Sequence, residues 1–131
     1  MLRKIRAADA TQGAFVVARN YWLVPPSGCQ IVVVPDSEVV ERFAAELTLF
    51  LAESQTSSSE QSGAERFPLV VSLIPWDVLP FDSISPSIEV SARRIEALDR
   101  LLTGDPCLMV TTADALAQSV LAPDVLRSSK L

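Results

Sequence analysis

Three short apolar runs, separated by helix-length segments, constrain the fold of this 131-residue chain more than any other feature. The runs are QIVVV at 30–34, LVVSLI at 69–74 and CLMV at 107–110. Continuous apolar runs of this length predict strands covered on both faces, as in a parallel sheet. The sequence therefore predicts a single α/β domain over 1–131, with a parallel sheet of about three strands flanked by helices. Within that sheet we expect 30–34 to be a central strand.

Two helices are predicted before the second strand. The first begins near Asp9 or Thr11 and is ended by the Pro25-Pro26 pair, since proline cannot continue a helix. The second has Asp36 as its N-cap and runs to about Ser54. The following residues, 55–66, are rich in serine and offer no large apolar side chain, which predicts a mobile surface loop.

Two more helices are predicted in the C-terminal half. One starts at Ser85-Pro86, with proline at its first position, and is capped by Gly104. The other begins at Thr111 or Thr112, runs to about Val120 and is ended by Pro123. The inner face predicted for the first of these helices consists of Ser91, Ile95, Leu98 and Leu102.

The charged residues restrict the classes of function. Eleven basic and sixteen acidic residues give a net charge of -5, which disfavours tight binding of DNA or RNA by this chain alone. The absence of histidine removes His-based acid–base catalysis, His-containing triads and the usual zinc sites. No apolar stretch is long enough for a membrane span, and the N-terminus lacks a convincing signal peptide, so we expect a cytoplasmic protein.

The two cysteines, Cys29 and Cys107, each stand at the entrance to a predicted strand. A small buried apolar residue is the commoner role at such a position. We therefore expect both to be reduced and inert.

A phosphate-binding loop is the first candidate site. Backbone N–H groups at a helix N-terminus bind phosphates when a glycine-rich loop precedes the helix and a lysine follows the glycines. Here the stretch has one glycine, no lysine and the bulky Phe15. We expect no ATP hydrolysis. The residues of this degenerate loop are Thr11, Gln12, Gly13 and Ala14.

Three carboxylates near the predicted strand ends are a second candidate. Asp36, Asp77 and Asp82 are the ligand type that Mg²⁺ prefers, and an alternative function is a small Mg²⁺-dependent phosphotransfer or hydrolase domain. The simpler interpretation is that Asp36 caps a helix and that the other two are solvated or accept backbone hydrogen bonds. We favour that interpretation and expect no metal, cofactor or catalytic residue.

The stretch from Trp76 to Pro86 is dense in aromatic and proline residues. Trp76 and Phe81 either pack a long loop onto the domain or form a protein contact surface, because aromatic residues are enriched at interaction hot spots. The arginines of the next helix are interpreted as a solvated face that pairs with nearby carboxylates.

The same stretch resembles the N-terminal segment of bacterial transcription-repair coupling factors (Mfd), with further similarities at Gly13-Ala14, Val32–Asp36 and Val110–Leu116. In that family the module resembles the first helicase-type domain of UvrB (domain 1a) with a degenerate phosphate loop. The motif and candidate interface consist of Trp76, Asp77, Leu79, Pro80, Phe81, Asp82, Ser85, Pro86, Glu89 and Arg94.

The resemblance implies a noncatalytic structural or protein-interaction module in transcription-coupled nucleotide excision repair. It also implies that the chain is an N-terminal fragment of a larger ATP-dependent DNA translocase. Its partners would be the other domains of that protein, with UvrA, RNA polymerase and DNA engaged through the full-length factor.

Overall fold

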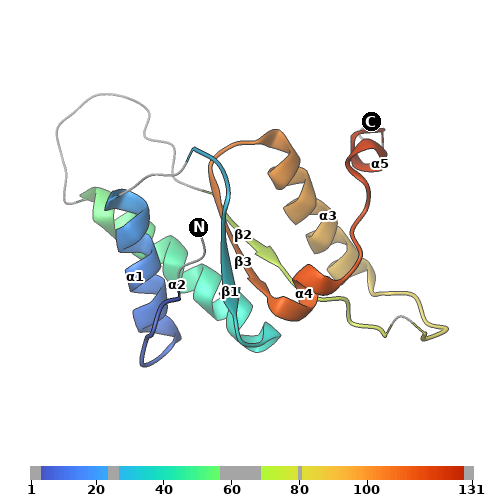
Figure 1. The fold of residues 1–131 in the computed structure, drawn as a ribbon, viewed down its shortest axis with the longest axis horizontal. Helices are drawn as coiled ribbons and strands as arrows, with labels where there is room; N and C mark the ends of the chain where they lie inside the picture. The colour runs from blue at the N-terminus through green and yellow to red at the C-terminus, as the bar shows by residue number, and fades with distance from the viewer. Residues whose placement is uncertain (1–3, 24–26, 57–68, 80, 129–131) are drawn as a thin grey trace.

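A computed structural model describes residues 4–23, 27–56, 69–79 and 81–128 of the chain (Figure 1). Helices and strands alternate along it, as the sequence predicts. In chain order the elements are α1 (Ala10–Leu23), β1 (Gln30–Val34), α2 (Ser37–Thr56), β2 (Leu69–Leu73), α3 (Ile88–Thr103), β3 (Cys107–Thr112), α4 (Ala113–Ala117) and α5 (Pro123–Ser128).

The three strands form a parallel sheet in the order β1-β3-β2, which confirms the predicted fold class. The central strand is β3, and all six of its residues are buried. The prediction that 30–34 is central is therefore wrong, because β1 lies at one edge of the sheet.

The edge position of β1 leaves one of its faces open. Val34 is buried against the helices on one side of the sheet, whereas Ile31 and Val33 on the other side are 53% and 52% exposed. The continuous β-branched run thus predicted the strand correctly but did not predict its burial. A run of β-branched residues can reflect β-strand propensity as well as burial of both faces of the strand.

Helices cover the two faces of the sheet separately (Figure 1). On one face the buried side of α2 packs against Leu108 and Val110 of β3, and α1 packs against α2. On the other face α3 and α4 cover β2 and β3 around Leu73, Ala97 and Met109. None of the helices described is both long enough and apolar enough to cross a membrane.

The first two helices begin where the sequence predicts. The carboxylate of Asp9 accepts a hydrogen bond from the backbone N–H of Gln12 at 2.8 Å, and Asp36 accepts one from Val39 at 3.0 Å. Each satisfies a backbone donor that the first helical turn leaves free. The helix α2 continues to Thr56, two residues beyond the prediction, and most of the predicted mobile loop at 55–66 lies outside the described residues.

The start and the inner face of α3 both differ from the prediction. Ser87 is its N-cap, accepting from the N–H of Val90, so Ser85 and Pro86 precede the helix. The buried residues are Arg94 and Ala97, whereas the predicted Ile95 is 45% exposed. The face was misplaced because an arginine was counted as a solvated residue. Gly104 does cap the helix in the left-handed conformation, with φ of 71°.

The C-terminal region contains two short helices in place of the single one predicted. Thr112 caps α4, accepting from the N–H of Ala115 at 3.2 Å, and this helix ends at Ala117. Pro123 begins α5 and does not end a helix, which agrees with the preference for proline at a first helical position. Leu126 anchors α5 against the rest of the domain.

Candidate interaction site

The connection between β2 and α3 carries most of the residues singled out in the sequence. Figure 1 shows it extending away from the sheet before the chain turns back into α3. Two aspartates hold its shape. Asp77 accepts from the backbone N–H of Ser87 at 3.2 and 3.3 Å, and Asp82 accepts from the N–H of Leu79 at 2.9 Å. The hydrogen bonds from Ser87 lower the pKa of Asp77.

A buried arginine ties this connection to the domain. Arg94, which is 1% exposed, donates through Nη1 to the carbonyl of Ile74 and, at 3.4 Å, to Gln118 at the end of α4. Its guanidinium stacks on the indole of Trp76, with Cζ 4.4 Å from the ring centroid. Gln118 also accepts from the backbone N–H of Trp76 at 2.7 Å. One arginine thus joins α3, the end of β2 and the end of α4.

Two nitrogens of Arg94, Nε and Nη2, are buried without a hydrogen-bond partner among the described residues. Burial lowers the pKa of this guanidinium, although an arginine stays charged. The sequence pattern had predicted a solvated position for Arg94. The signal was present as the stripe Val90, Arg94, Ala97 and Leu101, which has helical spacing but contains a charged residue.

Beyond this anchored base, the connection exposes large apolar side chains. Phe81 is 99% exposed, and Leu79, Ile84 and Ile88 are each 70% exposed or more. These four residues are called the Phe81 surface below. The two aromatics of the motif therefore have opposite roles: Trp76 packs onto the domain, whereas Phe81 faces solvent.

The segment that carries the Phe81 surface is acidic. Residues 67–92 contain three carboxylates, Asp77, Asp82 and Glu89, and no lysine or arginine. The next basic residue, Arg93, is paired with Glu89 and with Glu41 of α2, each at 2.8 Å. The segment that carries the Phe81 surface therefore combines exposed apolar residues with two carboxylates, Asp77 and Asp82, that form no ion pair with a basic residue of the described chain, while Glu89 is paired with Arg93. Of the other motif positions, Ser85 is exposed, Pro86 is partly buried, and Pro80 lies outside the described residues.

The stretch that the sequence predicted as a degenerate phosphate loop makes contacts within the chain. Residues 4–9 form no strand, so the strand–loop–helix arrangement of a phosphate loop is missing from this part of the structure. The side chain of Asp9 caps α1, and the side chain of Gln12 accepts from the N–H of Ala8 at 2.6 Å. Gly13 is packed against α2, where an added Cβ would lie 3.1 Å from the Phe43 ring. Ala14 is fully buried in the core.

Two polar residues of α2, Arg42 and Glu46, also form hydrogen bonds at the start of α1. Thr11 donates to Glu46 at 3.0 Å and accepts from Arg42 at 3.3 Å. Arg42 in turn binds Glu46 at 2.9 Å, so this arginine already has a carboxylate partner. The network joins α1 to α2.

The three carboxylates of the alternative metal site do not converge. Asp36 caps α2, while Asp77 and Asp82 accept backbone hydrogen bonds within the connection. Over the described ranges, no group of three or more histidine, cysteine, aspartate or glutamate side chains is arranged to hold a metal ion. In the part of the chain that the structure describes, these carboxylates therefore do not form the Mg²⁺ site that the alternative phosphotransfer or hydrolase function needs.

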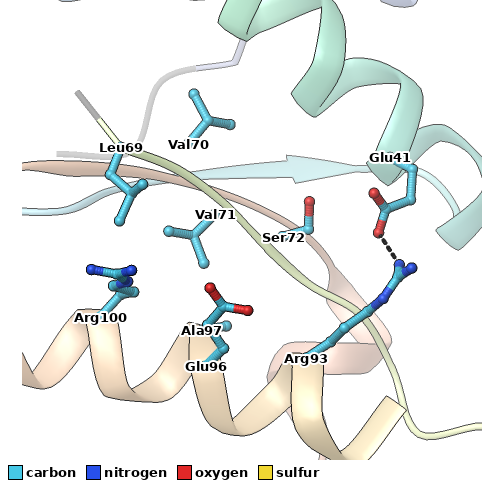
Figure 2. Close-up of a pocket in the computed structure, with 9 residues that line it drawn as sticks. All are labelled: Glu41, Leu69, Val70, Val71, Ser72, Arg93, Glu96, Ala97 and Arg100. Atoms are coloured by element: carbon cyan, nitrogen blue, oxygen red, sulfur yellow. Dashed lines mark hydrogen bonds and ion pairs between the residues drawn. The ribbon is translucent and has the colours of Figure 1, made fainter. Parts of the chain in front are cut away.

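A groove of about 210 Å³ follows the free edge of β2 (Figure 2). Figure 2 shows Arg93 reaching across from α3 to Glu41 of α2 at one end of this groove. The remaining lining is mixed, with residues 69–72 of β2 on one side and Glu96, Ala97 and Arg100 of α3 on the other. It is smaller than the usual pocket for a small-molecule ligand and has no converging set of polar groups.

Comparisons with known proteins give one distant similarity and no match to a protein-family model. The transcription-repair-coupling factor of Escherichia coli (strain K12) is 27% identical over 86 residues, which are 64% of this chain. The matched segment is 8% of the length of that protein. The similarity is to the same family that the motif from Trp76 onward predicts.

Proposed function

We propose that the chain is a noncatalytic docking module of a transcription-repair-coupling factor and that it contacts its partner through the Phe81 surface. The observation that carries this proposal is the exposure of large apolar side chains, above all Phe81 at 99%, on a connection whose backbone is held by hydrogen bonds to Asp77 and Asp82. The distant similarity to the coupling factor supports the DNA-repair context.

The noncatalytic part of the proposal rests on the start of α1. A phosphate group needs free backbone N–H groups and a nearby uncommitted cation. Asp9 places a carboxylate there, Gly13 is packed against Phe43, and Arg42 is paired with Glu46. A triphosphate would have to displace each of these contacts. We therefore propose that the nucleotide chemistry of the full-length factor resides outside this chain.

The proposal that the Phe81 surface contacts a partner rests on the exposure of its aromatic ring and on the charge of nearby carboxylates. An aromatic ring that is 99% exposed makes no contribution to the core but offers a large apolar area to a partner. The carboxylates around it favour a partner whose apolar pocket has a basic rim, because like charges would repel an acidic one. In the full-length factor, candidate partners are its other domains, UvrA and RNA polymerase. The acidic charge of the chain argues against DNA as the direct partner.

The test is a binding titration with Phe81→Ser. UvrA, RNA polymerase and the remainder of the coupling factor are immobilised separately, and the purified chain is titrated over each. We expect one of them to bind, with affinity about 30-fold weaker for Phe81→Ser, because an interface hot spot contributes about 2 kcal/mol or more. Since the ring is exposed, the urea midpoint of the variant should equal that of the original chain.

The matched control is Leu49→Ser on α2, which removes a side chain that is 63% exposed on another part of the domain. Binding by this variant should be unchanged. Failure of all three candidates to bind, or equal losses for the two variants, would contradict docking through the Phe81 surface.

A further inference from the structure

The two cysteines lie next to each other at the start of adjacent strands. The register of the parallel pair places Gln30 of β1 opposite Leu108 of β3. One residue before this pair stand Cys29, which directly precedes β1, and Cys107, which is the first residue of β3. Neighbouring strands are about 4.8 Å apart, which falls within the range of Cα separations of about 4.4–6.8 Å found in disulfides.

The side chains of the two cysteines also point to the same face of the sheet. Cys29 packs against the cluster of Leu73 and Met109 on the α3 side. Side chains alternate along a strand, so Cys107 shares a face with Met109, two residues later. Both residues are free thiols in this structure, Cys107 buried and Cys29 partly accessible.

We propose that Cys29 and Cys107 are a dithiol site that a low-molecular-weight disulfide oxidises to an intramolecular bond between β1 and β3. In the first step the thiolate of Cys29, which is the accessible one, attacks the oxidant RSSR. This forms a Cys29–SR mixed disulfide and releases one RS⁻. In the second step the thiolate of Cys107 attacks the Cys29 sulfur and releases the second RS⁻. The two protein protons end on two RSH molecules, so the oxidant gains the two electrons that the thiols lose.

The surroundings of the thiols determine how the site behaves. Burial, together with a hydrogen bond to the Cys107 side chain, raises the pKa of Cys29 to about 12. The thiolate is the reactive form, so the first step is slow at neutral pH and the reduced pair persists until oxidant is in excess. The bond would fasten β1, an edge strand with one open face, to the buried centre of the sheet.

The test treats the intact 131-residue chain with excess oxidised glutathione under native conditions. The reaction is quenched in acid, and free thiols are alkylated before intact-mass and peptide analysis. We expect a monomer that is lighter by two hydrogen atoms, carries no alkylated cysteine and gives a linked peptide pair containing both residues. Its far-UV circular dichroism should match that of the reduced chain, and its urea midpoint should be higher.

Two variants separate the steps. Cys107→Ser should stop at a stable glutathione adduct on Cys29, whereas Cys29→Ser should stay largely unmodified because Cys107 is buried. The proposal is overturned if the original chain accumulates glutathione adducts or linked dimers, or if it stays reduced under these conditions. A bridged product with a lower urea midpoint than the reduced chain also overturns it. These measurements on the original chain decide the question even if a serine variant fails to fold.

Discussion

The buried pair of Arg94 and Trp76 allows a quantitative test of how the connection is anchored. The guanidinium is 1% exposed and its Cζ lies 4.4 Å from the centroid of the indole ring. A cation–π contact contributes about 0.5–1 kcal/mol when exposed and about 2 kcal/mol when desolvated. Because Arg94 is desolvated, we expect a coupling energy of about 2 kcal/mol between the two side chains.

Single substitutions cannot give this value. Arg94→Met removes the contact with Trp76 and the hydrogen bonds to Ile74 and Gln118, but it also relieves the burial of two nitrogens that have no hydrogen-bond partner among the described residues. These contributions have opposite signs and each amounts to about 1–3 kcal/mol. A double-mutant cycle with Trp76→Leu cancels them and leaves the pairwise interaction. The donor of the hydrogen bond from Trp76 to Gln118 is a backbone N–H, so we expect this bond to form in all four proteins.

The assay is urea denaturation followed by far-UV circular dichroism, since the substitution removes a tryptophan fluorophore. Arg93→Met provides the matched control, because the neighbouring Arg93 is exposed and pairs with Glu41 and Glu89. Its cycle with Trp76→Leu should give no coupling beyond about 0.5 kcal/mol. If the Arg94 cycle also gave less than about 0.5 kcal/mol, the guanidinium would not be holding the indole, and the account of the anchored connection would be wrong.

Two further substitutions test other parts of the fold. Gly13→Val should destabilise the chain by about 1–3 kcal/mol by overpacking against the Phe43 ring, while Gly28→Val, which meets open space, should be close to neutral in the same urea series. If Gly13→Val were as stable as the original chain, Gly13 would not be tightly packed against Phe43 of α2. Asp77→Asn tests pH dependence. The pKa of Asp77 is lowered in the folded chain, so its carboxylate stabilises the fold at neutral pH. This stabilisation should be lost as the pH falls below about 4, through the lowered pKa of Asp77. Thermal melts of the two proteins should therefore converge in acid, and a difference that stays constant with pH would refute this.

Sequence reasoning predicted the parallel sheet because the three apolar runs have strand length and stand between helix-length segments. It did not predict the strand order. The run at 30–34 was expected to be the central strand. The structure instead places β3, which contains the CLMV run at 107–110, in the centre of the sheet. Strand order depends on which helices pack on which face, and a single-strand pattern does not contain that information.

The sequence singled out the segment from Trp76 to Arg94 as a candidate site, but it did not give the structural role of each residue. Arg94 was noticed as part of a motif and was interpreted as solvated, since an unpaired buried arginine is rare. Gln118 was not singled out, because a lone glutamine gives no sign that it will meet a tryptophan backbone 42 residues earlier. The exposed position of Phe81 also required coordinates, since Trp76 and Phe81 have similar surroundings in the sequence.

The arrangement of the connection explains why the roles of Arg94 and Phe81 were hard to assign from the sequence. It also supports the proposed docking. Its shape is held by polar bonds, from Asp77 and Asp82 to the backbone and from Arg94 to Ile74, so its large apolar groups are not needed to hold it. Burying Phe81 against its own domain would have removed a large apolar surface from water, which is favourable in folding. In the proposed docking, a partner that covers the ring would gain this free energy.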